Sequence, residues 1–155
     1  MIDSYLLNRL SDDRCRCYQL TRLWADKNEL VEILDEIGSL TSLESLKLYN
    51  NNIVTVPKSI GNLQNLKIFT LTKNKITTLP SSIGNLTNLQ TLLVNGNEIV
   101  DLPEEFEQLE LSVFKIVKSK LSTKSLDILK TIDKGVINRR FERANKKYGK
   151  PKGWR

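Results

Sequence analysis

The chain has 155 residues, 39% of them hydrophobic, a size and composition that suit one soluble domain with its own core. No segment has the apolar length of a membrane span, and no basic segment followed by an apolar run opens the chain, so we expect a cytoplasmic protein. The net charge of +6 is uneven, because residues 136–155 hold eight basic residues and one acidic residue, which leaves 16 basic and 17 acidic residues elsewhere.

Residues 1–19 are predicted to form an N-terminal cap. Ile2, Leu6 and Leu10 have helical spacing, which favours a short helix there. The two cysteines, Cys15 and Cys17, lie too close together to link distant parts of the chain, and this favours a reducing compartment. No histidine and no second cysteine pair could complete a metal site, so we expect no metal and no cofactor.

Residues 20–121 contain five copies of the pattern LxxLxLxxNxL. Four copies begin 23 residues apart, at Leu20, Leu43, Leu66 and Leu89. A fifth, degenerate copy begins one residue early at Leu111 and has Ser119 in place of asparagine. The second half of each unit also repeats, as xxLPxxIGxL, with prolines at 57, 80 and 103. Self-similarity at a fixed period of this length predicts a stack of identical structural units.

Each repeated residue type has a physical reason in such a stack. Alternating leucines predict a short strand with one buried face, which can be covered only by neighbouring units. Leu46, Phe69 and Leu92 are expected in one buried row. The sharp turn after each strand leaves backbone groups away from water, and an asparagine amide can both donate to them and accept from them. We therefore predict a structural asparagine ladder of Asn28, Asn51, Asn74 and Asn97.

With these motifs, residues 20–121 resemble the leucine-rich-repeat family, in particular its short intracellular type with 23-residue repeats. The resemblance implies an α/β leucine-rich-repeat solenoid with a parallel β-sheet on the concave face, extended and 3-10 segments on the convex side, and helical caps. It also implies that the concave sheet binds a partner.

The C-terminal part is predicted to hold two helices. Residues 122–135 are expected to be a cap helix with Leu126, Leu129 and Ile132 on one face. Residues 136–155 form a basic tail, in which four apolar residues follow helical spacing: Ile137, Phe141, Ala144 and Tyr148. Its candidate charged site residues are Arg139, Arg140, Arg143, Lys146 and Lys147. Such a helix either docks on the body as a cap or binds an acidic partner, a nucleic acid or an anionic membrane surface.

The third, fifth, seventh and eighth positions of each LxxLxLxxN segment are expected to face the concave surface. From these positions we predict ten partner-binding residues: Arg22, Trp24, Lys47, Tyr49, Ile68, Thr70, Lys73, Leu93, Asn95 and Lys115. The excess of basic residues favours an acidic partner. The apolar residues either anchor an interface or only strengthen the strands in which they lie.

The sequence thus favours a non-catalytic protein–protein interaction module, or scaffold, that binds a protein or peptide on the concave sheet. It is not expected to be an enzyme or to bind a small-molecule substrate, because it has no histidine, no phosphate-binding glycine loop and no carboxylate pair outside the convex loops. The alternative is binding of nucleic acid or an anionic membrane surface through the basic tail.

Overall fold

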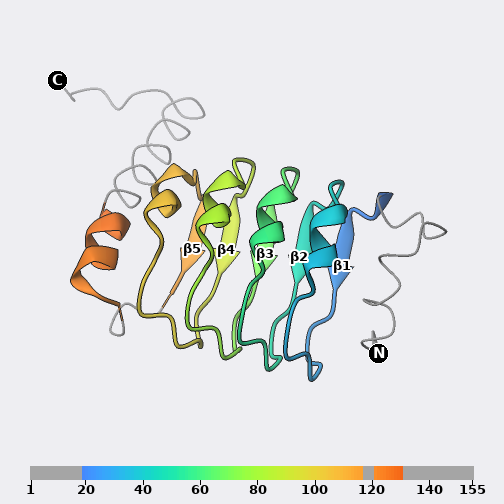
Figure 1. The fold of residues 1–155 in the computed structure, drawn as a ribbon, viewed down its shortest axis with the longest axis horizontal. Coiled ribbons are helices and arrows are strands. Elements are labelled where there is room, and N and C mark those ends of the chain that lie inside the picture. Colours follow the sequence, from blue (N-terminus) through green and yellow to red (C-terminus); the bar gives the residue numbers. More distant parts are fainter. Residues whose placement is uncertain (1–18, 117–120, 131–155) are drawn as a thin grey trace, which may run out of the picture.

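Five short parallel strands form one sheet whose order follows the sequence (Figure 1). This computed structural model describes residues 19–116 and 121–130. The strands are β1 (Arg22–Trp24), β2 (Ser45–Lys47), β3 (Ile68–Thr70), β4 (Thr91–Leu93) and β5 (Val113–Lys115). Equivalent positions of successive repeats pair throughout, and β5 keeps this register although its repeat begins one residue early. The predicted solenoid and its repeat register are confirmed.

A layer of 3-10 helices lies opposite the sheet, with the core between the two layers (Figure 1). These helices are η2 (Asp35–Ser39), η3 (Lys58–Asn62), η4 (Ser81–Asn85) and η5 (Glu104–Gln108). The residue before each helix is extended, with φ between −66° and −70°. In three repeats it is the proline of the xxLPxxIGxL motif. Proline suits this position because its ring fixes φ near this value and no backbone donor is required there.

Glycine lets neighbouring 3-10 helices approach closely. A Cβ atom placed on Gly61 would lie 2.6 Å from the carbonyl oxygen of Ser82, and one on Gly84 would lie 2.5 Å from that of Glu105. The equivalent residue of η5 is Glu107, which is exposed. The IGxL motif therefore marks the helices on which another 3-10 helix stacks.

The core is a set of parallel rows between the sheet and the 3-10 layer. Leu46, Phe69 and Leu92 are fully buried in one row, as expected, and Ile60 of η3 and Ile83 of η4 are fully buried as well. At the C-terminal end the rings of Phe106 and Phe114 pack with centroids 5.1 Å apart. Stacking therefore joins the apolar faces of single repeats into one continuous core.

Asn51, Asn74 and Asn97 are buried at the turns that follow β2, β3 and β4. The amide nitrogen of Asn74 donates to the carbonyl oxygens of Leu48 and Leu71, both at 2.9 Å, and its Oδ1 accepts the N–H of Ile53 at 3.0 Å. Asn51 and Asn97 make the equivalent bonds. Each asparagine thus joins its own repeat to the preceding one.

Asn28, the first of the four predicted ladder residues, has a different environment. It is half-buried, and its amide donates to the carbonyl oxygen of Asp26, 3.1 Å away and within its own repeat. The repeat of Asn28 contains β1, the edge strand of the sheet. Ser119, which takes the place of the fifth asparagine, lies outside the described residues.

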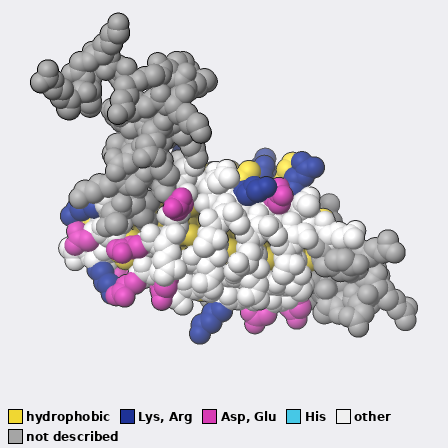
Figure 2. Space-filling view, turned by 90° about the horizontal axis from the view of Figure 1, so that it is seen from above, with side chains coloured by type: hydrophobic (Ala, Val, Ile, Leu, Met, Phe, Trp, Pro, Cys, Tyr) yellow, Lys and Arg dark blue, Asp and Glu magenta, His cyan; other side chains and the backbone are white. Residues whose placement is uncertain are grey.

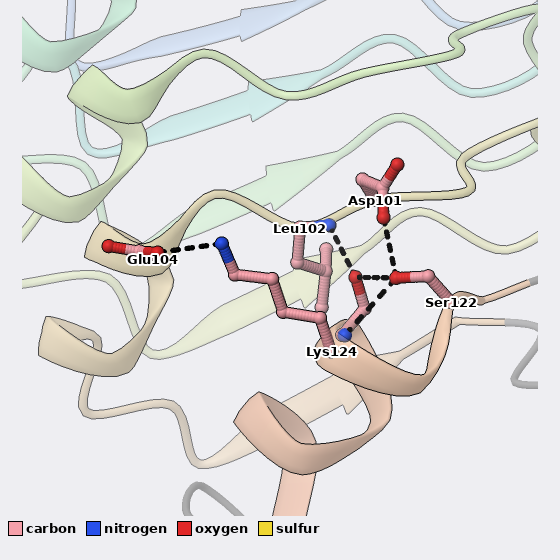
Figure 3. Close-up of polar contacts among 6 residues, drawn as sticks. Asp101, Leu102, Glu104, Ser122 and Lys124 are labelled. Carbon is pink, nitrogen blue, oxygen red and sulfur yellow. Dashed lines mark hydrogen bonds and ion pairs between the residues drawn. The ribbon is translucent and has the colours of Figure 1, made fainter.

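Residues 123–130 are helical and pack against the last repeats (Figure 3). Ile128 and Leu129 are buried, and the buried hydroxyl of Ser125 accepts the N–H of Leu102 at 2.9 Å. On the surface, Lys124 forms an ion pair of 2.7 Å with Glu104, which lowers the pKa of Glu104 and raises that of Lys124 through hydrogen bonding and charge attraction. This segment covers the apolar end of the repeat stack.

Several predicted features lie outside the described residues: the N-terminal helix with Cys15 and Cys17, Ile132, and the basic tail 136–155. The proposed boundaries of the caps therefore stay predictions. Within residues 19–116 and 121–130, no helix has the length and apolar character needed to cross a bilayer.

Candidate functional site

The outward-facing side chains of β1–β5, with those of the loops that follow the strands, form a surface that we call the strand face. Strand pairing places two rows of side chains across it. The first row is Arg22, Ser45, Ile68, Thr91 and Val113. The second row is Trp24, Lys47, Thr70, Leu93 and Lys115. Because the residue between the two rows in each strand points inward, both rows face the same side.

Trp24 lies on this face and crosses from β1 toward β2. Its indole Nε1–H donates a hydrogen bond of 3.3 Å to the hydroxyl oxygen of Ser45, and the ammonium group of Lys47 lies 4.3 Å from the ring centroid. The indole is still 53% exposed, whereas Ser45 is only 6% exposed. Ser45 thus faces the same side as the other third-position residues, but it is covered there, and its hydroxyl contacts the indole.

A second aromatic residue and lysine meet in the loops beyond β2 and β3. The ammonium group of Lys73 lies 5.6 Å from the ring centroid of the half-buried Tyr49. The backbone N–H of Tyr49 donates to the carboxylate of Asp26 at 2.7 Å, which ties this loop to the preceding repeat. Each cation is thus held over an aromatic ring while it keeps protons free for an external acceptor.

The eighth position of each of the first four repeats has an unusual backbone. Lys27, Asn50 and Lys73 have φ of 57–58°, and Gly96 has φ of 73°. This left-handed conformation is uncommon for lysine because its Cβ crowds the backbone. The same backbone conformation recurs in four successive repeats, so it fixes the direction in which the lysine side chains project from the loops.

Three further apolar side chains lie on the strand face. Ile68 and Val113 are exposed, and Leu93 is half-buried between their strands. Together with Trp24 of β1, these residues place one apolar side chain on the strand face from each of β1, β3, β4 and β5. Exposed apolar residues of this size, grouped on one surface, are typical of interfaces.

The charges of the two sides of the molecule differ. Arg22, Lys47, Lys73 and Lys115 lie on the strand face, where Asp26 already accepts a backbone hydrogen bond. The opposite side carries the acidic residues of η2 and η5: Asp35, Glu36, Glu104, Glu105 and Glu107. Figure 2 shows a cluster of basic and hydrophobic side chains with an acidic one beside it on one side, and acidic side chains with basic ones among them along the other. The strand face therefore carries more basic than acidic side chains.

All ten predicted partner-binding residues belong to the strand face or its loops, and the structure pairs Trp24 with Lys47 and Tyr49 with Lys73. Arg22 lies on β1, the strand that also holds Trp24, whereas Lys115 lies on β5 at the other edge of the sheet. Thr70 is half-buried in β3, and Asn95 accepts a 2.9 Å hydrogen bond from Thr72. The ladder residues Asn51, Asn74 and Asn97 lie inside the stack and take no part in this surface.

Sequence reasoning missed a second exposed apolar row, made by Val31, Val54 and Val100, with Thr77 completing the series. These residues follow the ladder asparagine of their repeats by three positions. The signal was available in the sequence, because β-branched residues recur there at intervals of 23 residues.

Comparisons with known proteins give one consistent family. The family profile described as leucine-rich repeat region matches residues 11–140. A solved leucine-rich-repeat protein of Leptospira interrogans is 30% identical and has a TM-score of 0.56; the match covers 74% of this chain and 36% of that one. No match was found among curated proteins.

Plant receptors are also similar in structure. The plant peptide hormone receptor RGFR1, solved in complex with RGF2, is 34% identical with a TM-score of 0.59, over 68% of this chain and 18% of the receptor. The PEPR1–AtPEP1 structure is 25% identical with a TM-score of 0.61, over 64% of this chain and 15% of that one. The chain thus spans about a third of the Leptospira protein and less than a fifth of RGFR1 or PEPR1.

Proposed function

The chain belongs to the leucine-rich-repeat family, and we propose that its strand face binds an acidic segment of another protein. The observation that carries the proposal is the pairing of aromatic rings with lysines on the strand face: the exposed Trp24 with Lys47, and the half-buried Tyr49 with Lys73. Each pair offers an apolar surface beside a cation, a combination that suits a peptide with both apolar and carboxylate side chains.

The size of the strand face favours a small ligand. Five strands at about 4.8 Å spacing make a surface roughly 20 Å wide, which fits a peptide, one helix or the edge of a small domain. Two structural neighbours support a ligand of this kind, since the solved RGFR1 structure contains RGF2 and is described as a peptide hormone receptor complex, and the PEPR1 structure contains AtPEP1.

In this proposal the chain acts without catalysis, as an interaction module or scaffold, and its location in the cytoplasm remains a prediction from the sequence. The absence of histidine from the sequence supports a binding role, because the commonest general acid and base is missing. Nucleic-acid or membrane binding through the tail gains no support from the structure, because residues 136–155 lie outside the described part.

The test is selection of ligands from a displayed peptide library by the full chain, followed by comparison of two charge reversals. Lys47→Glu changes the strand face, whereas Lys58→Glu makes the same change on η3, on the opposite side. We expect enrichment of acidic peptides that contain apolar residues, with binding lost in Lys47→Glu and kept in Lys58→Glu. Equal binding by the two folded variants would contradict the proposal.

A further inference from the structure

The row of β-branched side chains that follows the asparagine ladder is the second apolar surface of the described body. Val31, Val54 and Val100 are 62%, 45% and 50% exposed, and Thr77 between them is exposed as well. The N–H of Val54 donates to the carbonyl oxygen of Val31 at 3.1 Å, so these backbones lie at the spacing of hydrogen-bonded neighbours. Three such steps of about 4.8 Å make the row, which we call the valine row, roughly 15 Å long.

Acidic residues border the valine row. Glu29 and Glu98 lie two positions before Val31 and Val100, and Glu32 and Asp101 lie one position after them. All four are exposed. The exposed Lys75 is the one basic residue at the equivalent positions of the four described repeats. The surroundings of the valine row are therefore negative, in contrast to the strand face, and suit an apolar segment with basic borders.

We propose that residues 137–148 of the same chain dock along the valine row as an amphipathic helix. The four apolar residues of this segment are Ile137, Phe141, Ala144 and Tyr148. In a helix they span 12 residues, or roughly 17 Å, which matches the length of the row. Five basic residues accompany them: Arg139, Arg140, Arg143, Lys146 and Lys147. They match the acidic border in sign.

The path of the chain brings the tail to this surface. The N–H of Ser122 donates to the carbonyl oxygen of Val100 at 2.9 Å, so the C-terminal segment starts beside the last residue of the row. The helix over residues 123–130 then extends about 12 Å from that point. Residues 131–136 can span about 20 Å when extended, which is enough to return to the row.

Charge selects the valine row over the other exposed apolar surface. The strand face carries Arg22, Lys47, Lys73 and Lys115, which would repel a segment with five basic residues. Docking on the valine row leaves the strand face open. The inference is independent of the proposed function, because it concerns different residues and a ligand within the chain.

The test is amide hydrogen exchange of the full chain, followed by mass spectrometry, with two matched double variants. Val54→Thr with Val100→Thr replaces methyl groups of the valine row by hydroxyls and keeps the side-chain shape. Ile68→Thr with Val113→Thr makes a similar loss of apolar surface on the strand face. Circular dichroism of each variant shows whether the repeat body has folded.

We expect residues 137–148 to be protected in the free chain, and to exchange roughly tenfold faster in the valine-row variant but not in the strand-face variant. Glu98→Lys is expected to weaken protection in the same way, and added salt to weaken it further in the unmodified chain. The proposal is overturned if the tail exchanges at the unprotected rate in the free chain, or if the two double variants change its exchange equally. Protection that appears only with anionic vesicles or with RNA would overturn it as well.

Discussion

The indole N–H of Trp24 donates to the hydroxyl oxygen of Ser45 at 3.3 Å, and this contact joins the edge strand β1 to β2 on the surface that we propose as the binding site. The indole thereby has a defined orientation before any ligand arrives. A side chain that is ordered in advance loses less conformational entropy on binding.

This relationship gives a prediction about stability. Trp24→Phe removes the indole N–H that donates to the Ser45 hydroxyl oxygen. We therefore expect the free energy of unfolding to fall by about 0.5–1.5 kcal/mol. Ser45→Ala in the Trp24→Phe background should then cost less than Ser45→Ala alone, because the shared bond is already gone. Chemical denaturation of the four proteins of this cycle measures the difference. Strict additivity would show that the bond contributes nothing.

The asparagine ladder predicts an unequal effect of one substitution at two positions. Asn74→Ala removes three hydrogen bonds that span two repeats and leaves the buried N–H of Ile53 without its acceptor, so we expect a loss of about 1–3 kcal/mol. Among the described residues, Asn28→Ala removes one bond, within its own repeat, and should cost less, about 0.5–1 kcal/mol. Urea denaturation of both variants measures the two losses in the free energy of unfolding. A loss at Asn28 as large as that at Asn74 would contradict a ladder that works between repeats.

The close approach of the 3-10 helices predicts a steric effect. A Cβ atom on Gly61 would lie 2.6 Å from the Ser82 carbonyl oxygen, so Gly61→Ala must push η3 and η4 apart. We expect a destabilisation of about 1–3 kcal/mol. The matched substitution is Glu107→Ala at the equivalent, exposed position of η5, which should change stability by less than about 0.5 kcal/mol. Thermal unfolding of both variants provides the comparison, and equal shifts would be contrary evidence.

The surface pair Glu104 and Lys124 predicts a dependence on pH. Lys124 lowers the pKa of Glu104 in the folded chain, so the stabilisation is present above the carboxyl's unfolded pKa and is lost as the pH falls through the lower folded value. Lys124→Met should therefore be less stable than the unmodified chain near pH 7, and the gap should close below about pH 4. Both groups are exposed, so the gap should be small and should shrink with salt. A gap that is independent of pH would contradict this.

Much of the fold follows from the sequence because its signals are local and repeated. The interval of 23 residues fixes which residues pair between strands, and it identifies β5 even though its repeat begins one residue early. The proline and glycine positions predict the extended and 3-10 segments, because each residue type has a backbone reason to be there.

The arrangement within the candidate site is harder to predict, because it depends on side-chain directions between strands. Periodicity places Trp24 and Ser45 on the same face, but it does not predict that the indole crosses to β2 and buries the hydroxyl. Asn28 shares the ladder motif, yet its bonding differs because β1 is the edge strand of the sheet. A pattern read within one repeat does not contain this information about neighbours.

Oxidative footprinting of side chains, with and without a selected acidic peptide, tests most directly whether the strand face is the binding surface. The expected result is reduced labelling of Trp24, Tyr49 and Ile68 in the complex, with the labelling of Val31 and Val54 unchanged. Unchanged labelling of Trp24 and Tyr49 in a saturated complex, or protection confined to residues of η2–η5, would contradict binding at the strand face.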